Sequence, residues 1–203
     1  MDETLSWNTY FESTKTNPPS DTAINALKQF GTNKSKVIDL GCGAGTDSLY
    51  FLEQGWHVLA IDSQPDFIIR VRETMPNELR DIFEIKEMSF EELQLPYLVD
   101  CIIANYSLPF CNPKNFNKMW EEIVGNINKE GIFSGVFFGD KDEWANNFSK
   151  ERTFHSREQV MNLFEDFYII DFWEEDYDGR CCGRDGEAVP KHWHIFKVVA
   201  RKK

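Results

Sequence analysis

The chain has 203 residues, which is the size of one domain, or of one domain with a small appendage, and 41% of them are hydrophobic. Its 22 basic and 34 acidic side chains give a formal net charge of −12, which disfavours nucleic acid and anionic membranes as partners because both attract basic surfaces. The 17 Phe, 6 Trp and 6 Tyr residues exclude wholesale disorder.

Apolar runs of strand length alternate along the chain with stretches of helical periodicity. The expected strands are residues 36–40, 57–62, 83–86, 99–104 and 131–138. Start and stop signals mark the expected helices: an N-cap at Ser20 for a helix to about Phe30, a stop at Gly55, a first turn at Pro65, Asn112 followed by Pro113, and a capping box from Ser156 to Gln159. This alternation predicts an α/β fold, with a parallel sheet and helices on both faces.

The C-terminal part of the chain breaks the alternation. Two strands are expected at about 167–174 and 192–200, and the Asp-, Gly- and Arg-rich segment 175–191 is predicted to be the loop of a closing β-hairpin. Residues 1–31 are predicted to form an N-terminal lid or helix segment. Residues 32–203 are predicted to form a single globular domain.

A glycine-rich turn follows the first predicted strand. Residues 39–45 read Asp-Leu-Gly-Cys-Gly-Ala-Gly, and the helix after them offers free N–H groups to an anion. The second strand ends at Asp62, 21 residues after Gly41, where a carboxylate can accept both hydroxyls of a ribose. Because ligands bind at the carboxyl ends of parallel strands, we expect a nucleotide site here. The alternative is a glycine turn beside a surface aspartate.

The glycine spacing separates two kinds of nucleotide site. A dinucleotide-binding loop has the pattern G-x-G-x-x-G, whereas this chain has G-x-G-x-G followed by Thr46, which disfavours a nicotinamide oxidoreductase. The string from Val37 to Thr46 resembles motif I of the class I S-adenosylmethionine (SAM)-dependent methyltransferases. The resemblance extends over nearly the whole chain. It implies a Rossmann-like fold with a seven-stranded, mostly parallel sheet whose antiparallel last strand lies between the fifth and sixth.

The resemblance also implies a cofactor, SAM, with S-adenosyl-L-homocysteine (SAH) as its product. In this family the glycine loop packs against the methionyl part of SAM, the acid after the second strand binds the ribose, and residues after the third strand lie near the adenine. Ser89 stands where the family commonly has an acid, and its hydroxyl can still accept a hydrogen bond from the adenine amine. The implied cofactor-binding residues are Asp39, Gly41, Gly43, Gly45, Asp62, Ser63, Ser89, Phe90 and Asn105.

Two further segments resemble the tellurite-resistance-protein (TehB-like) group of small-molecule methyltransferases. They are residues 105–110 after the fourth strand and the His-Trp-His run at 192–194. The implied acceptor pocket contains Tyr106, Phe110 and Trp193.

Two histidines of the last strand are the candidate catalytic residues. His192 and His194 alternate with Trp193, so both imidazoles are expected to face one side of the strand, where each could act as a general base or bind an anion. The alternative is a structural role at the start of the strand. A metal site that adds Cys181 and Cys182 lacks the usual zinc spacing, and no metal is expected.

The sequence therefore predicts a methyltransferase that acts on a small molecule by in-line displacement. One alternative is a protein or nucleic-acid acceptor, which the charge and the absence of an Asn/Asp-Pro-Pro-Tyr motif after the fourth strand disfavour. The other is a SAM-binding protein without catalysis. No run reaches the ~18 apolar residues of a membrane helix, no signal-peptide pattern is visible, and the five scattered cysteines do not indicate disulfides. We therefore expect a cytoplasmic protein without a membrane partner; the sequence indicates no oligomeric state.

Overall fold

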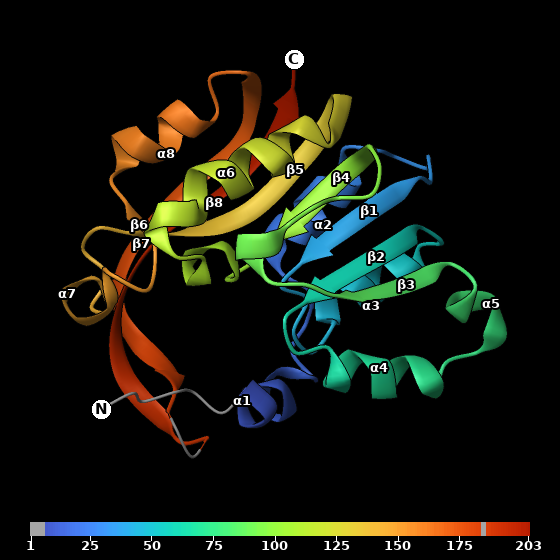
Figure 1. The fold of residues 1–203 in the computed structure, drawn as a ribbon, viewed down its shortest axis with the longest axis horizontal. Helices are drawn as coiled ribbons and strands as arrows, with labels where there is room; N and C mark the ends of the chain where they lie inside the picture. The colour runs from blue at the N-terminus through green and yellow to red at the C-terminus, as the bar shows by residue number, and fades with distance from the viewer. Residues whose placement is uncertain (1–6, 184–185) are drawn as a thin grey trace.

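The computed structural model, which describes residues 7–183 and 186–203, contains one eight-stranded sheet. Its order is β3-β2-β1-β4-β5-β8-β7, with β6 beside β5 (Figure 1). The strands are β1 (Lys36–Leu40), β2 (His57–Asp62), β3 (Phe83–Glu87), β4 (Val99–Ala104), β5 (Ile127–Gly139), β6 (Phe154–His155), β7 (Phe167–Cys182) and β8 (Ala188–Lys202). Strands β1 to β6 pair in parallel, and β8 runs antiparallel between β5 and β7. The predicted topology is confirmed; the two-residue β6 is additional.

Helices connect the strands. They are α1 (Trp7–Thr14), α2 (Asp21–Lys28), α3 (Thr46–Glu53), α4 (Asp66–Glu73), α5 (Asn77–Arg80), α6 (Pro113–Gly125), α7 (Ala145–Phe148) and α8 (Arg157–Leu163), with the 3₁₀ turns η1 (Phe90–Glu92) and η2 (Leu108–Phe110). Helices α2, α4, α6 and α8 begin at or beside the residues predicted to start them. Ser20 caps α2, Asn112 caps α6, and the box formed by Ser156 and Gln159 caps α8. Each cap satisfies N–H groups that the first turn of a helix leaves without partners.

Two apolar layers cover the sheet. On one face, α2, α3 and α4 pack Ala23, Phe51 and Ile68 against the strands. On the other face, α6 and α8 contribute Trp120 and Val160. All five side chains are buried, which leaves the carboxyl edge of the parallel strands as the place where a ligand can approach the sheet. None of the described helices is both long enough and apolar enough to cross a bilayer.

The closing hairpin is much longer than predicted, and the prediction of a loop at residues 175–191 is wrong. Strand β7 continues to Cys182, and β8 begins at Ala188. Cross-strand pairs explain the extension: the His192 imidazole contacts the carboxylates of Asp178 at 2.7 Å and Asp176 at 2.9 Å. Such pairs of opposite charge stabilise an antiparallel ladder. The loop was predicted because the segment is polar. Pairing between the two strands stabilises them despite this polar composition.

Candidate active site

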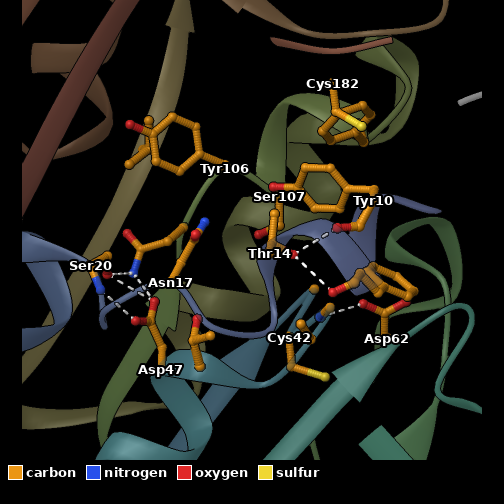
Figure 2. A pocket seen from close by; sticks show the side chains of 18 of the residues that line it. Tyr10, Thr14, Asn17, Ser20, Cys42, Asp47, Asp62, Tyr106, Ser107 and Cys182 are labelled. Carbon is orange, nitrogen blue, oxygen red and sulfur yellow. Dashed lines mark hydrogen bonds between the residues drawn. The ribbon is translucent and has the colours of Figure 1, made fainter. Parts of the chain in front are cut away.

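A cavity of about 990 Å³ lies at the carboxyl edge of the parallel strands, where ligands of open α/β sheets bind. Its size is at the upper end of the ~300–1,000 Å³ range of ligand sites. Figure 2 shows Asp47, Asp62 and Cys42 on one side of this space, and Tyr106, Tyr10 and Cys182 on the other. The cavity therefore has two chemically different ends.

The first end is built on the glycine loop between β1 and α3. Gly41 and Gly43 have φ angles of +69° and +52°, which side chains rarely allow. The N–H groups of Gly41 and Cys42 both donate to the carbonyl of Ile61, at 2.7 and 3.1 Å, so the loop is tied to β2. A Cβ atom on Gly41 would lie 2.3 Å from that of Ser107, and one on Gly43 would lie 3.2 Å from the Phe11 ring.

Replacing Gly41 by Ala should destabilise the protein and weaken SAH binding. The left-handed backbone alone costs about 1–2 kcal/mol for a residue with a Cβ atom, and the contact with Ser107 adds to it. Thermal unfolding and calorimetric titration with SAH measure the two effects. Gly125→Ala is the matched control, because its Cβ would meet nothing within 4 Å. Equal behaviour of the two variants would contradict the role of Gly41.

Asp62, at the end of β2, presents its carboxylate to the same end. One oxygen accepts the N–H of Gly43 and the other that of Gln64, both at 2.9 Å. Each carboxylate oxygen can accept a second hydrogen bond, so two donors on neighbouring atoms, such as the hydroxyls of a ribose, fit this group. Asp62 lines the cavity, as do Ser63, Ser89 and the ring of Phe90, which lies over Gly41.

Beside the glycine loop, two buried polar side chains, Thr22 and Asp47, form hydrogen bonds with the half-buried Ser20 and Asn105. Asp47 accepts hydrogen bonds from the N–H of Ser20 at 2.7 Å, its hydroxyl at 2.8 Å and the Asn105 amide at 2.7 Å. The Asn105 carbonyl in turn accepts the hydroxyl of Thr22 at 2.5 Å. These bonds join the start of α2 to the end of β4 and fix the orientation of Asn105, which lines the cavity.

Asp39, near the end of β1, is more deeply buried than Asp47. The Ser48 hydroxyl donates to it at 2.6 Å. Burial, with the nearby charges of Asp47 and then Asp62, raises the pKa of Asp39 to about 8. Burial and the neighbouring carboxylates therefore favour the protonated form of Asp39, which adds no negative charge to this end of the cavity.

The raised pKa of Asp39 predicts a specific dependence of stability on pH. Because the folded state holds this proton more tightly than the unfolded state, the contribution of Asp39 is fully present below about pH 4 and is lost as the pH rises toward about 8. Asp39→Asn should abolish this contribution, so that the variant loses less stability than the parent between pH 5 and pH 8. Melting temperatures across this range measure it, with exposed Asp81→Asn as the control. Parallel curves for Asp39→Asn and the parent would contradict the neutral state.

Helix α1 covers the glycine loop. Phe11 is buried against Ala44 and Phe67, and the hydroxyl of Ser13 lies 4.0 Å from the Cys182 sulfur on the hairpin. The spacing of Trp7, Tyr10 and Phe11 at i, i+3 and i+4 is a helical signal that sequence reasoning did not use.

The second end of the cavity is aromatic. The predicted residues Tyr106, Phe110 and Trp193 all line it. Sequence reasoning missed Phe138, Trp144 and Tyr177. We call these six residues the aromatic wall. Their rings meet mainly edge to face, as for Tyr106 and Trp193 with centroids 6.3 Å apart, a favoured arrangement of aromatic pairs.

Three predicted site residues do not line the cavity. Trp193 points into it, so the alternation of β8 directs His192 and His194 to the opposite face of the strand. His194 is buried there, where its Nδ1 accepts the N–H of Lys141 at 3.1 Å and its Nε2 lies 3.1 Å from Glu174. The expectation that these imidazoles face the same way is confirmed, but their contacts are those of structural residues. Gly45 precedes α3 as its N-cap, against Ile68.

Comparisons with known proteins agree with this geometry. Residues 37–131 match the family described as a methyltransferase domain, and no curated protein matches the sequence. The structure of TehB from Haemophilus influenzae superposes with a TM-score of 0.77 at 20% identity, covering 97% of this chain and 67% of that one. A 1,6-didemethyltoxoflavin-N1-methyltransferase from Burkholderia thailandensis, with SAH bound, gives 0.67 at 17%, covering 97% and 81%.

A third structure, the N-methyltransferase NodS from Bradyrhizobium japonicum WM9 with SAH, gives a TM-score of 0.64 at 14% identity, covering 96% of this chain and 98% of that one. At these identities the solved structures show that the fold is similar. The match over residues 37–131 and the glycine loop indicate a methyltransferase domain. Residues 37–131 thus carry a methyltransferase domain of the SAM-dependent kind, and the fold of the chain resembles that of TehB.

Proposed function

We propose that this chain transfers the methyl group of SAM to a small molecule. The observation that carries the proposal is the shape of the cavity: its glycine-loop end continues directly into an end walled by aromatic rings and bordered by α1 and the β7–β8 hairpin. An acceptor bound there is surrounded by side chains, as small ligands are. A protein or nucleic-acid acceptor needs an open groove, and the net charge of −12 opposes the latter.

The cofactor end supplies the groups that SAM needs. In this proposal Asp62 accepts the ribose hydroxyls, Ser89 and Phe90 border the adenine, and the backbone of Gly41 and Gly43 allows close approach of the methionyl part. Asp39, Ser63 and Asn105 complete this end. Bound SAM supplies an electrophilic methyl carbon, and its bond to sulfur breaks as an acceptor lone pair attacks, with the bonding electrons staying on sulfur.

The role of the chain in this reaction is mainly to align the acceptor with the methyl group. Tyr106 is suited to it because it directly follows Asn105, so it lies where the two ends of the cavity meet. Its φ of +54° is unusual for an aromatic residue, and strain of this kind is often kept where a side chain must point in one direction.

The test combines binding with turnover. SAH should raise the melting temperature, since a ligand that binds only the folded state stabilises it. Incubation with SAM and a panel of neutral heterocycles, small thiols and chalcogen oxyanions should give SAH and one methylated product, detected by mass spectrometry. A shift with NAD and none with SAH would contradict the cofactor assignment. SAH binding without transfer to any small molecule, but with methylated protein or RNA, would favour the alternative acceptors.

We further propose a cytoplasmic location. The five cysteines are all free, and Cys101 and Cys111 are buried among apolar side chains. Unpaired thiols are usual in a reducing compartment. Fractionation of cells that express the tagged chain tests this location.

A further inference from the structure

Two positively charged side chains, Lys191 and Arg152, stack on rings of the aromatic wall without lining the cavity themselves. The Lys191 ammonium lies 3.6 Å from the centroid of the Trp193 ring, 4.3 Å from that of Trp144 and 5.5 Å from that of Phe138. Lys191 is buried, does not line the cavity, and forms an ion pair with buried Asp142 at 2.5 Å. Three rings of the wall therefore share one ammonium group that belongs to the protein itself.

The guanidinium group of Arg152 forms similar cation–π contacts with a neighbouring part of the aromatic wall. Its guanidinium carbon lies 4.4 Å from the centroid of the Trp144 ring and 5.0 Å from that of Phe110, and on another side it meets Phe148 at 4.3 Å. Its Nη1 is buried without a hydrogen-bond partner among the described residues. Stacking on aromatic rings is thus the main interaction of this guanidinium group.

These contacts bear on the charge of the ligand. An aromatic cage attracts a cation through the negative faces of its rings. Here four rings of the wall, those of Phe110, Phe138, Trp144 and Trp193, already interact with Lys191 or Arg152. A second cation placed against these four rings would meet faces that Lys191 and Arg152 already occupy and would lie close to the Arg152 charge. The aromatic wall, unlike the glycine-loop end with Asp47 and Asp62, is therefore unsuited to an ammonium or pyridinium ligand.

The cationic side chains near the aromatic wall are also poorly placed to bind an anionic ligand. Lys191 is held by Asp142, and Lys197, which lines the cavity, forms an ion pair with Glu175 at 2.6 Å. Among the described lining residues, the remaining cation is Arg180, which is exposed at the rim and donates to the carbonyl of Ala188. The interior of the wall is therefore aromatic and offers no free charge.

We propose that the methyl acceptor is an uncharged, planar aromatic or heteroaromatic molecule that lies against the aromatic wall. This rests on the proposed function and names its substrate class. A nitrogen, oxygen or sulfur lone pair of the acceptor forms the bond to the methyl carbon as the carbon–sulfur bond breaks toward sulfur, and any proton on that atom leaves to solvent. The hydroxyl of Tyr106 makes no hydrogen bond with another described residue and is free to orient the acceptor heteroatom.

Bicyclic aromatic probes of different charge, together with the inorganic anion selenite, test the proposal. Quinoline, N-methylquinolinium, naphthalene-2-sulfonate and selenite are titrated by calorimetry into the free chain and into the SAH-loaded chain. Because Lys191 and Arg152 already occupy faces of the wall, quinoline should bind about tenfold more tightly than N-methylquinolinium and more tightly than either anion. Tighter binding of N-methylquinolinium, of the sulfonate or of selenite would overturn the proposal.

Variants locate the probe and test the reason for its neutrality. Trp193→Ala should weaken quinoline binding about tenfold, whereas Trp173→Ala, at an exposed tryptophan outside the cavity, should leave it unchanged. Arg152→Met should strengthen N-methylquinolinium binding about threefold and leave quinoline within about twofold. Equal quinoline affinity in the two tryptophan variants, or no gain for the cation in Arg152→Met, would count against the proposal.

SAH binding and probe binding are measured independently, so failure of the proposed function and failure of this inference give different results. Failure of SAH to bind contradicts the proposed function, while the titrations of the free chain still test the aromatic end. Melting temperatures are measured first for every variant. Should Trp193→Ala fail to fold, Arg152→Met carries the test, because it removes a group that makes no side-chain hydrogen bond to the described residues.

Discussion

Lys191→Met is expected to lower the free energy of unfolding by about 3–5 kcal/mol. The Lys191 ammonium lies 2.5 and 2.6 Å from the two carboxylate oxygens of Asp142, and both side chains are at most 1% exposed. Among the described residues, removal of the cation leaves the buried carboxylate with the N–H groups of Trp144 at 3.0 Å and His194 at 3.3 Å as its remaining hydrogen-bond donors. Urea unfolding at constant m-value measures the loss.

Two further variants show whether this loss comes from the unpaired charge. The double variant Lys191→Met, Asp142→Asn should recover most of the stability, because the amide keeps an acceptor for Trp144 and carries no charge. Lys141→Met breaks an ion pair with Asp176 in which the two side chains are 63% and 38% exposed, so it should cost less than about 1 kcal/mol. Similar losses for Lys141→Met and Lys191→Met would show that burial does not set the energy.

Asp62→Ala is expected to weaken SAH binding by about 100-fold or more. A hydrogen bond to a charged group contributes about 1.5–3 kcal/mol, and two of them to a ribose would give about 3–6 kcal/mol, with each 1.4 kcal/mol worth about a factor of ten. The variant also loses the contact that holds the Gly43 N–H. Isothermal titration with SAH measures the affinity, and the melting temperature of the free protein shows that the fold is kept.

Graded substitutions at Asp62 sharpen this test. Asp62→Asn keeps one acceptor oxygen and should bind SAH with intermediate affinity. Asp81→Ala removes an exposed aspartate at the end of α5 and should bind SAH like the parent. An Asp62→Ala protein that is folded and binds SAH normally would show that the ribose is held elsewhere.

The sequence was most informative where local chemistry decides the structure. The apolar runs at 36–40 and 57–62 and the caps at Ser20, Asn112 and Ser156 depend on neighbouring residues, and the structure has them at the predicted positions. The glycine loop was found for the same reason, since its positive φ angles need glycine at defined spacing.

Apart from the order of the strands, which the resemblance implied, features that depend on distant parts of the chain were not predicted. The extension of β7 and β8 through residues 175–191 depends on pairing between two polar strands, which neither strand shows alone. Strand alternation placed His192 and His194 on one face, and the resemblance placed Trp193 in the pocket, but the packed sheet was needed to show that the two histidines face away from the cavity. Trp144 entered the site without any local signal, because its position is set by the fold around Asp142.

The two ends of the cavity come from different parts of the chain, and this has a consequence for how the protein can diverge. The cofactor-end residues from Asp39 to Asn105 fall within residues 37–131, the matched methyltransferase domain. Most of the aromatic wall, from Phe138 to Trp193, falls outside it. Under the proposed function, changes in the C-terminal third retune acceptor choice while the cofactor end stays intact. For engineering, this region is the natural place to build a library of altered acceptor specificities.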